Sequence, residues 1–132
     1  MGENALVESK ISEGILLIKQ LDEDDNSPSF ATWYFYADVN EWRLIIAGPK
    51  FDELLPKKEP IAYKKIIESM SKLSLESLSV SDIKLVPTTS PLPLAIRTLI
   101  RTADPTGFSQ AHFIDTTLNG IFMKELIISR ST

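Results

Sequence analysis

The sequence contains no cysteine and a single histidine, His112. Without cysteine the chain cannot form a disulfide, a thiolate zinc site, an iron–sulfur cluster or a cysteine nucleophile. One histidine is too few for a multi-histidine metal site within one chain, so a hard-metal site would need carboxylates. The composition therefore predicts neither a metal centre nor a cofactor.

Basic residues and long apolar runs are also scarce. The 14 Lys and Arg residues against 18 Asp and Glu give a net charge of −4, whereas nucleic-acid-binding proteins usually carry a basic surface. Apolar runs such as residues 14–18 and 44–48 are far shorter than the roughly 20 residues that span a bilayer. The first residues lack the basic start and apolar run of a signal peptide. We expect one globular domain over residues 1–132, without linker or targeting segment, in the cytoplasm.

The apolar pattern predicts three helices and five strands. Helices are expected over residues 4–21, 60–73 and 91–101, and strands over 31–37, 42–47, 82–86, 109–118 and 121–129. Residues 94–100 also alternate as a strand would, but Ser90-Pro91 is typical of a helix start. The order α-β-β-α-β-α-β-β favours an α+β fold with a mainly antiparallel sheet of five strands. The helices would pack on it as a two-layer α/β sandwich.

The first predicted hairpin is rich in aromatic residues. Placing Ala37 opposite Trp42 gives one wholly apolar face, which contains Trp33, Phe35, Leu44 and Ile46. The other face then carries Tyr34, Tyr36, Arg43 and Ile45. In this register Tyr36 faces Arg43, an arrangement suited to a cation–π contact.

This second face is the candidate binding surface. Aromatic strand residues more often fill a core, which we expect for Trp33, Phe35 and Trp42. If no layer covers Tyr34 and Tyr36, they form an exposed patch with Arg43 and Ile45. Surfaces rich in Tyr and Arg are typical of protein interfaces.

The second predicted hairpin turns at Asn119-Gly120, a strong short-range hairpin signal. With Leu118 opposite Ile121, His112 faces Ile127 and has two polar diagonal neighbours, Glu125 and Ser129, at roughly 7–8 Å. A relay with Ser129 or Thr116 as nucleophile, His112 as base and Glu125 as orienting group is conceivable. The simpler alternative is an ordinary sheet histidine beside polar neighbours. The absence of a nucleophile elbow at Ser129 favours this alternative.

Two charged segments have ordinary and functional interpretations. Asp22, Asp24 and Asn26 alternate like the start of a calcium loop, but the turn glycine and the bidentate glutamate are missing, which favours a solvated loop. A basic face could include Lys57, Lys58, Lys64, Lys65, Arg97, Arg101 and Arg130. Glu59 and Glu68 lie among these residues in the sequence and reduce the positive charge of such a face. Ordinary surface charge is therefore the simpler interpretation.

Taken together, these patterns favour a small non-catalytic protein-interaction or binding module. Its partner would be another protein or a second copy of the chain in a homodimer. A small hydrolase using His112, Glu125 and Ser129 is the alternative, and a nucleic-acid-associated protein is a third hypothesis. Within the first hypothesis, an acidic inhibitor of a basic target is one form that the negative charge would suit.

Overall fold

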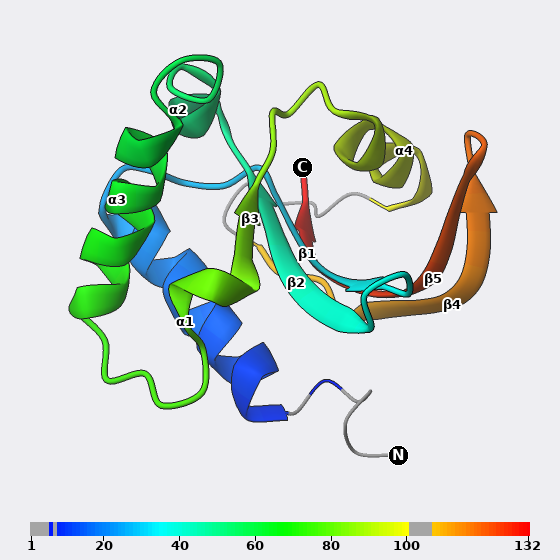
Figure 1. Ribbon diagram of the computed structural model, residues 1–132, viewed down its shortest axis with the longest axis horizontal. Coiled ribbons are helices and arrows are strands. Elements are labelled where there is room, and N and C mark those ends of the chain that lie inside the picture. Colours follow the sequence, from blue (N-terminus) through cyan, green and yellow to red (C-terminus); the bar gives the residue numbers. More distant parts are fainter. Residues whose placement is uncertain (1–5, 7, 101–106) are drawn as a thin grey trace.

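The computed structural model describes residues 6, 8–100 and 107–132, which form a curled sheet with helices on both faces (Figure 1). The strands are β1 (Phe30–Tyr36), β2 (Glu41–Ala47), β3 (Ile83–Leu85), β4 (Ala111–Leu118) and β5 (Ile121–Ser131). The helices are α1 (Glu8–Glu23), α2 (Pro49–Asp52), α3 (Glu59–Ser71) and α4 (Pro91–Leu99), together with the 3-10 turn η2 (Val80–Asp82).

The five strands form one sheet in the order β3-β2-β1-β5-β4. Neighbouring strands are antiparallel, except that β2 and β3 run parallel. A parallel pair needs a long crossover connection, and residues 48–82, which contain α2 and α3, provide it. The expected α+β class with a mainly antiparallel five-stranded sheet is confirmed.

Helices α1 and α3 pack on one face of the sheet and form the expected helical layer. Side chains alternate between the faces of a strand, so Trp33 and its cross-strand partner Leu44 both lie in this core. Gly14 lets α1 approach closely, because a Cβ there would lie 3.3 Å from both Trp33 Nε1 and Leu44 Cδ2.

Helix α4 packs on the opposite face, inside the curl of the sheet (Figure 1). Its Ile96 joins a second buried cluster drawn from β1, β2 and β5: Phe30, Ile45, Ala47, Met123, Leu126 and Ile128. The helix confirms the Ser90-Pro91 start signal over the alternative strand, and the expected helical residue Arg101 lies outside the described residues. The two-layer arrangement expected from the sequence placed the helices on one face of the sheet, whereas α4 lies on the other.

The ends of the other helices differ from expectation by a few residues. Helix α1 continues to Glu23 instead of ending at Leu21, and the short helix α2 forms where the sequence analysis expected no helix. Ile67, an apolar residue of α3, is 49% exposed. The buried residues of α3 are Ala62, Ile66 and Ser69, so the inward face is rotated away from Ile67.

The first hairpin forms with a register two residues away from the predicted one. Phe35, not Ala37, lies opposite Trp42, and Arg43 faces Tyr34. A shift of two residues leaves every side chain on the same face, so the division into two faces holds although the pairs are wrong. The turn spans residues 37–40, and Asn40 takes a positive φ of 57°.

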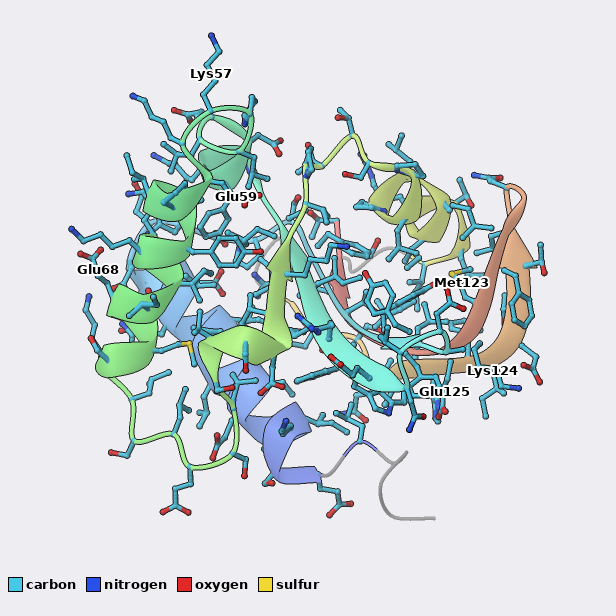
Figure 2. All side chains as sticks on the ribbon, in the orientation of Figure 1. Lys57, Glu59, Glu68, Met123, Lys124 and Glu125 are labelled. Carbon is cyan, nitrogen blue, oxygen red and sulfur yellow. The ribbon has the colours of Figure 1, made fainter. Side chains whose placement is uncertain are left out.

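The second hairpin follows the predicted register, with the partners Ala111 and Ile128, Phe113 and Leu126, and Leu118 and Ile121. It bends where Asp115, at φ 49°, forms an ion pair of 3.1 Å with Lys124. Beyond the bend Met123 points toward α4, whereas Lys124 lies on the outer side (Figure 2). The end of the hairpin therefore folds over beside α4.

Arg130 is a fully buried cation that joins the last strand to the end of α1. Its Nη1 and Nη2 donate to the two carboxylate oxygens of Asp22 at 2.8 and 3.0 Å. It also donates to the carbonyls of Pro28 (3.2 Å) and Gly107 (2.9 Å), and its guanidinium lies 4.8 Å from the ring centroid of Phe108. Arg130 therefore serves packing and cannot belong to the basic surface considered above.

Candidate functional site

Tyr34 and Tyr36 are half-buried residues of β1 on the α4 side of the sheet. Their rings meet edge to face with centroids 4.9 Å apart, a favourable geometry for aromatic pairs. The Tyr34 hydroxyl donates a hydrogen bond of 3.5 Å to the carbonyl of Phe122. Burial raises the pKa of Tyr34 above its ordinary value, and the neighbouring Tyr36 and Asp38 act in the same direction.

The two tyrosines border a groove of about 350 Å³ between the sheet and α4, here called the tyrosine groove. Its apolar walls are Ile45, Val86, Leu92, Pro93 and Ile121. Helix α4 covers Ile45 so well that it is only 1% exposed. Ile45 is thus part of the wall and not, as the sequence suggested, of an exposed patch.

Lys84 stands at this groove and was missed by the sequence analysis. It lies on β3, opposite Ile45 on β2, with an exposed side chain. Its Nζ is 5.2 Å from the ring centroid of Tyr36, so Lys84 and not Arg43 makes the cation–π contact. Within the described parts of the chain Lys84 forms no ion pair. Only its alternation between buried Ile83 and Leu85 marked it as a surface residue.

Arg43 borders a second hollow, of about 440 Å³, on the other side of Lys84. Its guanidinium donates to Glu41 at 2.9 Å and to the carbonyl of Ser81 at 3.0 Å, so these partners fix its position. Tyr63 of α3 lines the same hollow, and its hydroxyl accepts the backbone N–H of Leu85. All three tyrosines of the chain therefore lie around Lys84 and Arg43.

The structure brings only part of the predicted relay together. His112 Nε2 and Glu125 Oε2 lie 2.7 Å apart, with side chains 46% and 32% exposed. Ser129 is buried and lines a separate hollow of about 470 Å³, whose wall includes neither His112 nor Glu125. Among the described residues no hydrogen bond joins Ser129 to His112, and the Thr116 hydroxyl donates to the carbonyl of Ile114.

The acidic loop serves internal contacts. Asp22 binds Arg130, and Asp24 accepts hydrogen bonds from Ser69 of α3 (2.6 Å) and from Lys72 (2.8 Å), which directly follows that helix. These contacts, the one from Lys72 above all, lower the pKa of Asp24 below its ordinary value. In the described residues no group of three or more histidine, aspartate or glutamate side chains is placed to hold a metal ion. No helix of these residues combines the length and apolar character needed to cross a membrane.

Comparison with protein-family models, with curated proteins and with solved structures finds no match to this chain.

Proposed function

We propose that this protein is a non-catalytic binding module that holds a segment of a partner protein in the tyrosine groove. The observation that carries the proposal is an open apolar groove bordered by two half-buried tyrosines and by a lysine that forms no ion pair with any described residue. A tyrosine side chain has an apolar ring and a polar hydroxyl. It therefore suits a surface that is exposed to water in the free protein and buried when a partner binds. A volume of about 350 Å³ lies within the range of sites that hold a few side chains or a small ligand.

The chemistry around the groove supports a role in binding. It combines aromatic rings, apolar walls and one cation, which are the groups that anchor protein interfaces. Tyr34, Tyr36 and Arg43, proposed from the sequence as binding residues, all border one of the two adjoining hollows. A partner that covered both hollows would contact all three.

The hydrolase alternative has one supporting contact, the 2.7 Å approach of His112 to Glu125. A serine relay also needs the nucleophile within hydrogen-bond reach of the histidine, and among the described residues Ser129 makes no such bond. The pair is partly exposed at the surface and, among the described residues, has no hydrogen-bonded nucleophile, so binding is the better-supported function. Replacing His112 with alanine should leave partner binding unchanged.

Photo-crosslinking from inside the groove tests the proposal. We would place benzoylphenylalanine at Leu92, on the groove wall, and as a matched control at Ile67, which is exposed on α3. In cells of the native host, a discrete protein adduct is expected from position 92 and not from position 67. Adding Tyr36→Ala should remove it. Equal adducts from both positions, or an adduct indifferent to Tyr36→Ala, would contradict the proposal.

The partner in this proposal can also be a second copy of the chain. In that case the adduct would have twice the chain mass of 14.8 kDa, and native mass spectrometry of the purified protein would give a dimer. A cytoplasmic location remains a prediction, which fractionation of host cells would check.

A further inference from the structure

We propose that the tyrosine groove recognises the C-terminal residue of a partner polypeptide. An apolar side chain would enter the groove, and the terminal carboxylate would pair with Lys84. This inference rests on the proposed function and names the chemistry of the ligand.

The walls of the groove require an apolar side chain. Ile45 of β2, Leu92 of α4, Ile121 of β5 and Val86, which directly follows β3, line the same space. A polar group placed among them would lose its hydrogen bonds to water without replacement. An aliphatic or aromatic residue would instead cover apolar surface that is now in contact with water.

Lys84 places a positive charge beside that apolar side chain. It is the only charged residue on the groove wall as described, it forms no ion pair there, and it lies directly across from Ile45. The other anion donor expected at such a place is a helix N-terminus, and α4 does begin at this groove. Its residues Pro91 and Pro93 have no backbone N–H. One lysine and few other donors suit a carboxylate better than a phosphate, which needs several donors.

The charges around the groove favour a single carboxylate over an acidic stretch. Asp38 lies at the end of the β1–β2 hairpin, Glu41 beside Arg43, and Glu59 on the wall of the second hollow. The whole chain carries a net charge of −4. A run of acidic side chains would meet repulsion from these groups, whereas a terminal residue brings one carboxylate attached directly to the residue that fills the groove.

The open form of the groove favours a polypeptide end over a fatty acid. A free acyl chain lying in an open groove would leave much of its length in water. A polypeptide brings its own backbone and preceding residues, which can extend over Tyr36 into the second hollow beside Arg43. The two hollows share Tyr36 and Lys84 on their walls.

Methyl NMR titration with two matched probes tests the inference. N-acetyl-leucine carries the carboxylate, and N-acetyl-leucinamide is the same molecule without the charge. The probes would be followed at the methyl groups of Ile45, Val86, Leu92 and Ile121. We expect the acid to bind roughly two- to fivefold more tightly than the amide, the contribution of an exposed ion pair. Lys84→Gln should reduce that ratio to one, while Lys124→Gln, which removes a lysine already paired with Asp115, should preserve it.

Each other outcome overturns the inference. Equal binding of acid and amide would show that the groove takes an apolar group without its carboxylate, and the proposed function would stand. Tighter binding of hexanoate than of N-acetyl-leucine would point to an acyl ligand. If none of the four methyl groups responded to any probe, the groove would not bind a C-terminal residue. The crosslinking experiment would still decide whether the groove contacts a protein.

Discussion

The buried contact between Asp22 and Arg130 provides the sharpest stability test. Arg130 is 0% exposed and Asp22 only 16%, and two hydrogen bonds of 2.8 and 3.0 Å join them. Breaking a buried ion pair by removing one partner costs about 3–5 kcal/mol, because the other charge stays buried without compensation. We expect Asp22→Asn and Arg130→Met each to cost about 3 kcal/mol.

The double variant gives the decisive quantity. Once one charge is gone, removing the other relieves the uncompensated charge, so the two costs should not add. We expect the double variant to cost about 4 kcal/mol, which corresponds to a coupling of about 2 kcal/mol between the two sites. Methionine keeps most of the buried alkyl length of Arg130, so loss of packing contributes little to the comparison.

Urea unfolding followed by tryptophan fluorescence would measure all four proteins, since Trp33 is fully buried. Lys124→Met is the matched control, because its ion pair with Asp115 is more than half exposed and should contribute less than about 0.5 kcal/mol. The reasoning would be refuted if the losses of unfolding free energy in the two single variants added up to the loss in the double variant within about 0.5 kcal/mol. A cost for Asp22→Asn no larger than that of the control would refute it as well.

Three further predictions concern local features. Glu13 accepts backbone N–H groups of residues 76–78, and these bonds, the one from residue 78 above all, lower its pKa below 4.5. Its stabilising effect is therefore full above that pH and lost as the pH falls further, so the urea midpoints of wild type and Glu13→Gln should differ at pH 7 and converge in acid. Gly14→Ala should destabilise by about 1 kcal/mol in urea unfolding, because crowding against Trp33 outweighs the gain in helix propensity. Gly120→Ala should cost about 1 kcal/mol through its φ of 78° alone, since a Cβ there has open space, and thermal unfolding would check it.

The two hairpins show what an alternating pattern predicts and what it leaves open. Asn119-Gly120 fixed the length of the second turn and with it every cross-strand pair. The first hairpin has no such dipeptide, and a shift by two residues changes the pairs without changing the faces. The residue at positive φ in that turn, Asn40, was the available signal for the true turn.

The candidate site was predicted in part for a similar reason. Alternation along β1 correctly placed Tyr34 and Tyr36 on one face, opposite Trp33. It carried no information on what covers that face, so the burial of Ile45 under α4 was missed. Arg130 was also misread, because its partner Asp22 is 108 residues away and nothing in the local sequence distinguishes a buried arginine from a surface one.

The position of β1 in the sheet has a consequence for how the chain folds. This central strand pairs on one side with the adjacent β2 and on the other with β5, and the Thr32 hydroxyl donates to the carbonyl of Ile127, 95 residues further along. During synthesis one edge of β1 must therefore wait, unpaired, until nearly all of the described chain has left the ribosome. Contacts so distant in sequence are slow to form, and an exposed central strand invites pairing with another chain. The strand order therefore predicts that the incomplete chain associates with other chains more readily than the finished protein does.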